Sequence, residues 1–310
     1  MLEKKKISTA EFLKMFGFQK NDSPPLFLEK FRQMNTEYRE PTREEFEEYV
    51  FMVLKLISSP GIKRSKEENL KAWETGWGEN LAAVGSDKAL GESLKPRYFR
   101  PNKFLRYNKQ LIVSENLNLE HDLFTLARYL LCTKYLSSYE DVYEFGSGSC
   151  QNLLMLSEMF PSKRLYGLDW ASASQKIAEA LSASKNLNIK GIVFDMMNPS
   201  PEVVLKPNSA VFTIHSLEQL DNQYEKLLGF IIAAKPAIIM HYEPIVEFYN
   251  RENFLDYLAL LYSQKRNYLN GFWPALCRLK EEKKIEILEA RRPYLGGVIH
   301  ESSLIVWKPV

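Results

Sequence analysis

The residues best suited to chemistry begin with a glycine turn at residues 144–148, which reads EFGSG. Two glycines separated by one residue, Gly146 and Gly148, let the backbone turn sharply and approach a ligand closely. A dinucleotide-binding turn would place a third glycine at position 151, where this chain has Gln151. Glu144 stands two positions before the first glycine, and a carboxylate there suits a cationic amino group better than a pyrophosphate. The turn therefore favours an amino-bearing ligand over a dinucleotide.

Two more carboxylates follow strand-like runs farther along the chain. Asp169 comes 21 residues after Gly148 (169 − 148), a spacing at which a carboxylate reaches both ribose hydroxyls of an adenosine. Asp195 and Met196 follow the next run and place a carboxylate beside an apolar side chain. Such a pair can hold the amino group of an adenine and cover its face. The carboxylates, in this order, predict a ligand that contains adenosine.

Three histidines flank later strand-like runs: His215 and His241 follow the fourth and fifth, and His300 precedes the last. Glu218 and Glu243 lie close to the first two in sequence. A histidine of near-neutral pKa can accept a proton from a substrate hydroxyl, and His215 and His241, with Glu218 close by, are candidates for this role. Alternatively, the three histidines and Glu243 can hold a divalent metal that acidifies the hydroxyl. The third interpretation is that these histidines only bind neighbouring loops.

From residue 141 onward the sequence alternates between strand-like and helical segments, which is typical of parallel βαβ units. The strand-like runs are residues 142–145, 165–168, 189–194, 210–214 and 237–240. Two further runs, 284–289 and 303–307, have no helix between them, so we expect them to pair antiparallel. The pattern predicts an α/β fold with a doubly wound, seven-stranded sheet.

The earlier part of the chain has helical periodicity instead. Thr42 can cap a helix in which Phe46, Val50 and Val53 recur at helical spacing, and residues 121–135 form another apolar helical pattern. We therefore expect residues 1–138 to be a mainly helical extension or lid, and residues 139–310 to be the ligand-binding domain.

From the glycine turn to the closing pair of strands, over about residues 140–310, this ordered set resembles the class I S-adenosylmethionine (SAM)-dependent methyltransferases. The resemblance implies the strand order 3-2-1-4-5-7-6, with the last strand antiparallel. The implied cofactor residues are Glu144, Gly146, Gly148, Asp169, Asp195 and Met196. In the family's pattern the first acid and the glycines hold the methionine part of SAM, the second acid holds the ribose, and the third acid holds the adenine. Cys150 departs from the pattern, because a third glycine is common there.

The implied strand order would also place His215, His241 and His300 along one rim of the sheet, beside the methyl group. In this family the end of the fourth strand usually faces the reacting atoms, which makes His215 the first choice for the base and His241 the second. The Asn-Pro-Pro-Tyr or Asn-Pro-Pro-Phe segment of amino-group methyltransferases is absent after the fourth strand, which leaves oxygen or carbon as the acceptor atom, with oxygen preferred. The resemblance implies SAM-dependent methyl transfer to a small-molecule acceptor. Two alternatives stay open: a SAM-binding module without catalysis, and a nucleotide-dependent oxidoreductase on a similar scaffold.

Composition limits the partners. A net charge of +2 and a pI of about 8.2 indicate no basic surface for nucleic acid. The most apolar stretch, residues 227–240, is interrupted by Lys235 and Pro236 and is too short to span a bilayer, so no membrane partner is expected. Three cysteines without a C-x-x-C motif, and no secretory signal, favour the cytoplasm. The N-terminal helices could mediate homo-oligomer formation.

Overall fold

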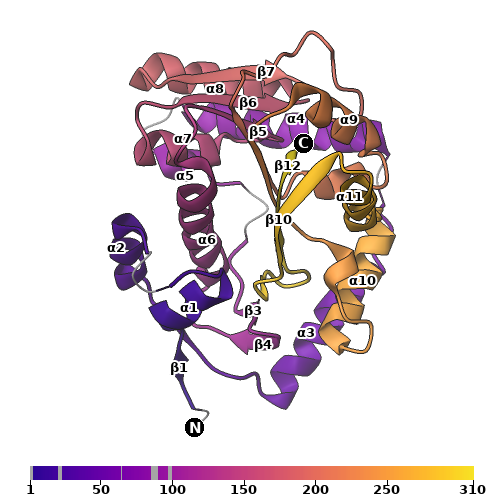
Figure 1. Cartoon of the computed structure of the whole chain (residues 1–310). Coiled ribbons are helices and arrows are strands. Elements are labelled where there is room, and N and C mark those ends of the chain that lie inside the picture. Colours follow the sequence, from indigo (N-terminus) through magenta and orange to yellow (C-terminus); the bar gives the residue numbers. More distant parts are fainter. Residues whose placement is uncertain (1–2, 20–22, 64, 85–89, 97–99) are drawn as a thin grey trace.

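The computed structural model describes residues 3–19, 23–63, 65–84, 90–96 and 100–310. A seven-stranded sheet runs through the middle of the molecule, with helices on both sides (Figure 1). Its strands are β5 (Asp141–Phe145), β6 (Arg164–Asp169), β7 (Ile189–Val193), β8 (Ala210–Ile214), β9 (Ile238–Glu243), β10 (Ile285–Arg291) and β12 (Ser303–Pro309). They lie in the order β10-β12-β9-β8-β5-β6-β7. Numbered by their sequence order within this sheet and read from β7, they follow the order 3-2-1-4-5-7-6.

Neighbouring strands from β7 to β9 pair in parallel, whereas β12 runs antiparallel to both β9 and β10. One detail differs from the expected hairpin. Between β10 and β12, the two-residue strand β11 (Leu295–Gly296) pairs with β3 (Phe104–Tyr107), which also pairs with β4 (Gln110–Val113). The connection between the last two strands is therefore joined to a segment nearly two hundred residues earlier in the chain.

Helices cover both faces of the sheet, because successive strand residues point to opposite sides. Val142 belongs to a hydrophobic cluster that includes α6 (Leu119–Leu136), α7 (Gln151–Met159) and α8 (Ser172–Lys185). Tyr143, the next residue, belongs to a second cluster with α9 (Glu225–Ala234) and α11 (Phe272–Glu281). The three-layer arrangement brings the carboxyl ends of the parallel strands to one edge, where ligands bind in such folds.

The earlier part of the chain contains α1 (Thr9–Met15), α2 (Pro25–Gln33), α3 (Arg43–Ile57), α4 (Lys66–Val84), α5 (Leu90–Leu94) and the short paired strands β1 (Lys5–Lys6) and β2 (Glu37–Tyr38). The cap predicted at Thr42 is confirmed: its hydroxyl accepts from the Glu45 backbone N–H, and the Glu45 carboxylate accepts from the Thr42 backbone N–H. Phe12 shares one hydrophobic cluster with Val142 of the central sheet. The division at residue 138 stays a prediction.

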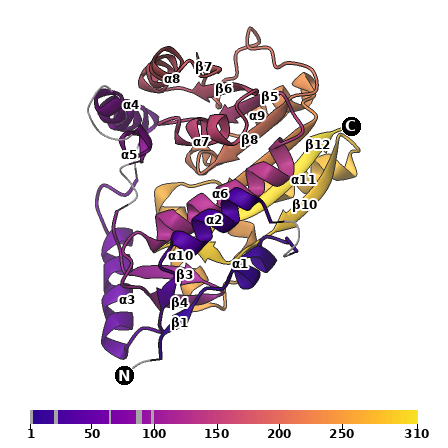
Figure 2. The ribbon, with the colours of Figure 1, turned by 90° about the vertical axis from the view of Figure 1, so that its left-hand side faces the viewer.

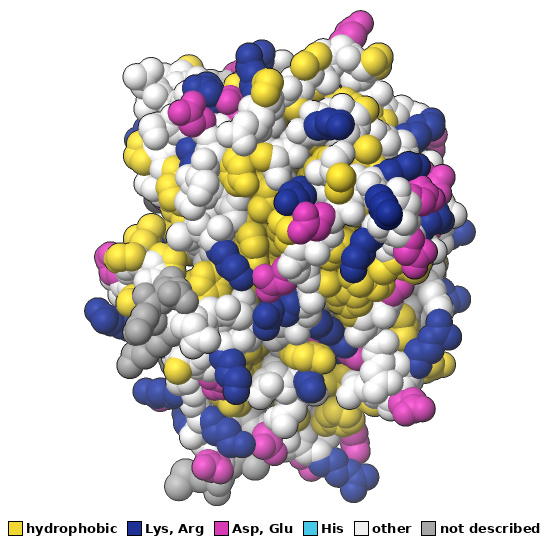
Figure 3. All heavy atoms as spheres, viewed as in Figure 1, with side chains coloured by type: hydrophobic (Ala, Val, Ile, Leu, Met, Phe, Trp, Pro, Cys, Tyr) yellow, Lys and Arg dark blue, Asp and Glu magenta, His cyan; other side chains and the backbone are white. Residues whose placement is uncertain are grey.

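Two surface features bear on partners. Figure 3 shows Lys and Arg side chains interspersed with Asp and Glu on the face that it draws. Among the described residues, no helix has both the length and the apolar character that crossing a membrane requires.

Candidate functional site

A single pocket at the carboxyl ends of the parallel strands gathers the six residues that the resemblance implies for the cofactor. Glu144, Gly146, Gly148, Asp169, Asp195 and Met196 all line it. His215 and Ser216, which follow β8, line the same pocket. The predicted cofactor residues and the first-choice catalytic histidine therefore face one space.

The glycine turn has a backbone that only glycine tolerates well. Gly146 has φ +78°, and a Cβ built on it would lie 2.2 Å from the Cβ of Ser216. Gly148 has φ +50°, and a Cβ there would lie 2.8 Å from a ring carbon of Trp77. Cys150 also adopts a left-handed conformation, with φ +61°, which explains why glycine is favoured at this position in the family's pattern.

Glu144 is 1% exposed and lies at the pocket wall. One carboxylate oxygen accepts from the Asn152 side-chain amide at 2.6 Å, whereas the other, Oε2, is buried and has no hydrogen-bond partner. Burial raises the pKa of Glu144 to about 8, against the opposing influence of Asn152 and Arg128. A buried carboxylate oxygen without a donor is costly, so this atom fits a ligand that brings a cationic N–H.

Asp169 is held by backbone N–H groups at the end of β6. Its Oδ2 accepts from Gly148 at 2.8 Å and its Oδ1 accepts from Ala171 at 2.9 Å. Burial raises its pKa to about 6, although these two N–H groups act in the opposite direction. The carboxylate is thus fixed across the glycine turn, at the place where a ribose-binding acid is expected.

Asp195 and Met196 follow β7. Asp195 accepts from the Met197 backbone N–H at 2.8 Å and pairs with the Lys66 ammonium at 2.8 Å. Burial raises the pKa of Asp195, but Lys66 and Asn198 outweigh it, and the net direction is downward. The acid therefore stays ionised and partly exposed beside the pocket.

Helix α4 covers this end of the pocket and was missed by sequence reasoning. Figure 2 shows it alongside α8, and the Glu74 carboxylate fixes it there by accepting from the Ser172 and Ala173 backbone N–H groups in the first turn of α8. Trp73 and Trp77, one turn apart, stack with ring centroids 5.3 Å apart and line the pocket. Their i, i+4 spacing was a visible signal, but nothing in the sequence indicated which surface they would face.

His215 lines the pocket and also lies beside Glu218 and His300. It has φ +54°, and its Nδ1 lies 3.7 Å from Glu218 Oε2. His300 Nε2 lies 3.7 Å from the same oxygen, so the structure brings these three predicted residues together. Burial lowers the pKa of His215, but the carboxylates of Glu218, Glu243 and Glu120 raise it more, and the net direction is upward.

His241 does not join this group, which corrects the expectation of three histidines on one rim. Trp307 Nε1 donates to its Nε2 at 2.9 Å, so Nδ1 carries the proton and bonds Thr213 Oγ1 at 2.9 Å. Burial lowers its pKa to about 3. The reason is strand alternation: His241 points into the α9–α11 face, against the ring of Phe272. It is suited neither to proton transfer nor to metal binding.

Glu243, predicted as a metal ligand, is fully buried near the group. Its Oε1 accepts from the Ser216 backbone N–H at 3.0 Å, and its Oε2 has no hydrogen-bond partner. Burial raises the pKa of Glu243 to about 7, although the positive charge of His215 acts in the opposite direction. Glu218, predicted as a partner of the proton-accepting histidine and not as a metal ligand, is the carboxylate that lies between His215 and His300.

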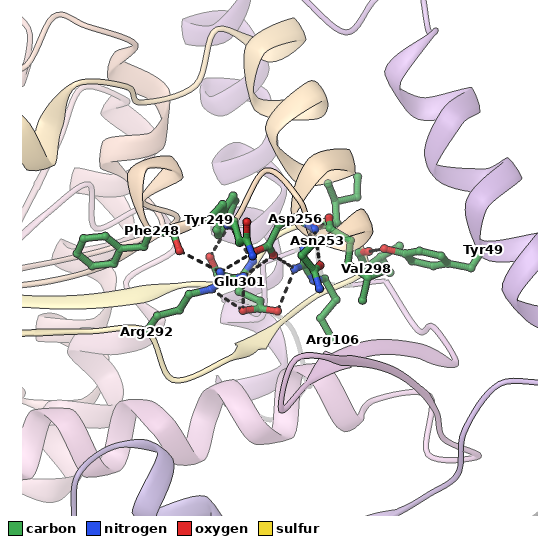
Figure 4. Close-up of polar contacts among 12 residues, drawn as sticks. Tyr49, Arg106, Phe248, Tyr249, Asn253, Asp256, Arg292, Val298 and Glu301 are labelled. Atoms are coloured by element: carbon green, nitrogen blue, oxygen red, sulfur yellow. Dashed lines mark hydrogen bonds and ion pairs between the residues drawn. The ribbon is translucent and has the colours of Figure 1, made fainter.

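The segment that presents His300 is anchored by a buried ion network (Figure 4). Glu301 pairs with Arg106 of β3 at 3.0 Å and with Arg292 at 2.8 Å, and both arginines also bind Asp256 of α10 (Phe254–Arg266). The hydroxyl of Tyr249 donates to the Glu301 carbonyl and accepts from its N–H. His300 is thereby positioned by residues from four separate parts of the chain.

No protein-family model and no curated protein matches this chain. Similar solved structures include SpnF, a 4+2 cyclase, at 10% identity and TM-score 0.53, covering 80% of this chain and 97% of that one. The geranyl diphosphate C-methyltransferase of Streptomyces coelicolor A3(2) matches at 11% identity and TM-score 0.47, covering 82% and 100%. Coclaurine N-methyltransferase matches at 11% identity and TM-score 0.47, covering 84% and 99%. The strand order is the one that the resemblance to the class I SAM-dependent methyltransferases implies, and the likeness to SpnF shows a Rossmann-like fold; identities this low show the fold alone.

Proposed function

We propose that this protein binds SAM in the pocket at the ends of β5, β6 and β7, and transfers its methyl group to a hydroxyl oxygen of a small-molecule acceptor. The observation that carries the proposal is the orphaned Oε2 of buried Glu144, in one pocket with the glycine turn and two further strand-end acids. A dinucleotide would bring phosphates to this carboxylate, whereas SAM would bring an ammonium group.

Each part of SAM has matching residues here. Glu144 would bind the amino group, and the backbone of Gly146 and Gly148 would lie against the methionine part. Asp169 would bind the ribose, and Asp195 with Met196 would border the adenine. When bound, SAM supplies an electrophilic methyl group on a sulfonium.

The chain's own residues would then handle the acceptor. The acceptor oxygen gains the methyl carbon and loses its proton, while the carbon–sulfur bond breaks with its electrons retained by sulfur. His215, on the pocket wall, would activate the hydroxyl, either by accepting this proton or by holding the oxygen through a metal ion. Glu218, 3.7 Å away, would stabilise positive charge on His215. Phe124, whose ring centroid lies 5.2 Å from that of His215, also lines the pocket and would place an apolar surface beside the acceptor.

The test is methyl transfer from isotope-labelled SAM to a panel of hydroxylated small molecules, read as a labelled product with one added methyl group. With an acceptor from that panel, His215→Ala should retain affinity for S-adenosylhomocysteine (SAH) but lose at least about 100-fold in turnover, a typical contribution of a positioned acid–base group. A protein that binds SAH but labels no hydroxylated, carbon or nitrogen acceptor would support a non-catalytic module instead.

A further inference from the structure

His215, Glu218 and His300 have a spacing that hydrogen bonding does not explain. Both imidazole nitrogens lie 3.7 Å from Glu218 Oε2, beyond the range of about 2.7–3.2 Å for N–H···O bonds. Glu218 is 8% exposed, and its Oε2 has no hydrogen-bond partner. This oxygen lies between two imidazole nitrogens and is hydrogen-bonded to neither, whereas the other carboxylate oxygen accepts from the Gln219 side-chain amide at 3.1 Å.

The same spacing suits three ligands of one ion. Ligands at about 2.0–2.1 Å from a tetrahedral centre lie roughly 3.4 Å from one another, within a few tenths of an ångström of the distances here. The ligand atoms of all three residues fall within 4.8 Å of one another. We propose that His215, Glu218 and His300 bind one divalent transition-metal ion, which holds and polarises the acceptor hydroxyl.

The surroundings support ligand roles for both histidines. His215 Nε2 lies 2.8 Å from Ser302 Oγ, so Nδ1 is left facing Glu218, and a second hydrogen bond of this kind orients metal-binding histidines. The left-handed backbone of His215 is costly for a non-glycine residue and persists only where its surroundings require it. His300 is fixed by the ion pairs of Glu301, its neighbour in the chain (Figure 4).

Two buried carboxylate oxygens in this region lack hydrogen-bond partners, Glu218 Oε2 and Glu243 Oε2. A divalent ion bound by Glu218 would give the first of them the partner that it lacks.

The ligand set identifies the class of metal. Two imidazole nitrogens and one carboxylate suit Zn²⁺, Mn²⁺, Fe²⁺ or Co²⁺, whereas Mg²⁺ prefers oxygen ligands. His215 lines the pocket, so an ion bound to it would lie beside the space proposed for the acceptor. Three protein ligands leave positions open for a substrate oxygen. Only this role toward the acceptor rests on the proposed function; binding of the ion does not.

The experiment is a titration of the metal-free full chain with Co²⁺. Binding is measured by calorimetry and by the visible absorption of the bound ion. We expect one Co²⁺ per chain, displaced by Zn²⁺ and not by an equal concentration of Mg²⁺. Glu218→Gln and His300→Gln should each weaken Co²⁺ binding at least about 100-fold. This loss is larger than that expected for a residue that only hydrogen-bonds to a metal ligand. His121→Gln is the matched control: its side chain is 18% exposed, similar to that of His300, and it should bind Co²⁺ as the wild type does.

Absence of stoichiometric Co²⁺ binding to the folded wild type would overturn the proposal, as would equal binding by Glu218→Gln and His121→Gln. Circular dichroism establishes that each variant is folded. If the ligand variants unfold, Ser302→Ala takes their place, with an expected loss of about tenfold through release of His215. SAH titration of the metal-free chain, run in parallel, separates this proposal from the methyltransferase proposal: either ligand can bind when the other does not.

Discussion

The cofactor end of the pocket differs in construction from the acceptor end, which we define as His215 on the pocket wall with Glu218 and His300 beside it. At the cofactor end, Glu144, Asp169 and Asp195 lie at or just beyond the carboxyl ends of three adjacent parallel strands, and local backbone N–H groups fix the carboxylate of Asp169. At the acceptor end, His215 and His300 meet only because β12 folds back beside β9 and an ion network from Arg106 anchors the intervening segment. The cofactor end is therefore organised by the strand ends themselves, whereas the acceptor end depends on contacts between distant segments.

Removing Arg106 tests this difference most severely. Arg106→Gln should lower the free energy of unfolding by about 3 kcal/mol, because it breaks two buried ion pairs. This value is near the lower limit for a buried ion pair, since Arg292 still bridges Asp256 and Glu301 in the variant. Chemical denaturation measures this loss. Under native conditions, Co²⁺ binding should weaken more than SAH binding does. A variant that loses both ligands equally would show that the two ends are not independent.

Removing the charge of Glu144 tests the cofactor end alone. Glu144→Gln should weaken SAH binding about 30-fold, equivalent to about 2 kcal/mol, because a charge-assisted hydrogen bond to the amino group is lost. Calorimetry measures the affinity. The unliganded variant should be at least as stable as the wild type, since it no longer buries a carboxylate with an orphaned oxygen. Unchanged SAH affinity would remove Glu144 from the site.

The pH dependence of SAH binding is a second test of the role of the Glu144 carboxylate. Burial raises the pKa of Glu144 to about 8, so in the unliganded protein this acid is mostly protonated below that pH. Because the ionised form binds the ammonium, SAH affinity should rise with pH between 6 and 8, by up to about tenfold per unit. The stability of the unliganded protein should change in the opposite direction. Because folding raises the pKa of Glu144, the free energy of unfolding should fall as the pH rises from the ordinary pKa of a glutamate toward 8. Glu144→Gln should flatten the binding profile; a profile that stays steep would assign the titration to another group.

The smallest effect is expected at the rim of the cofactor end. Lys66 pairs with Asp195 at 2.8 Å, but their side chains are 41% and 30% exposed. Exposed ion pairs contribute about 0–1 kcal/mol, so Lys66→Met should change SAH affinity by less than about fivefold. A large loss on calorimetric titration would mean that α4 closes the pocket through this pair rather than through Glu74 and the tryptophans.

The same contrast explains what the sequence could predict. Asp169 was identifiable because its distance along the chain from Gly148 reflects one βαβ unit, whose geometry is nearly constant. The placement of His241 was wrong because strand order alone does not say to which face of the sheet a side chain points. Neighbouring residues of a strand point to opposite faces, and His241 points toward Trp307. Trp77 could not be assigned, because a helix outside the sheet has no fixed position in the pattern. Likewise, the pairing of Glu218 with His300 depends on the path of a long connection, which local spacing does not encode.

The most direct test of the central claim is calorimetric titration of the wild type, Asp169→Asn and His300→Gln with SAH. We predict micromolar binding to the wild type, a loss of at least about tenfold in Asp169→Asn through the weakened ribose contact, and near wild-type binding to His300→Gln, which lies at the acceptor end. Failure of the folded wild type to bind SAH would contradict the SAM-dependent account, and dinucleotides would then be the ligands to test.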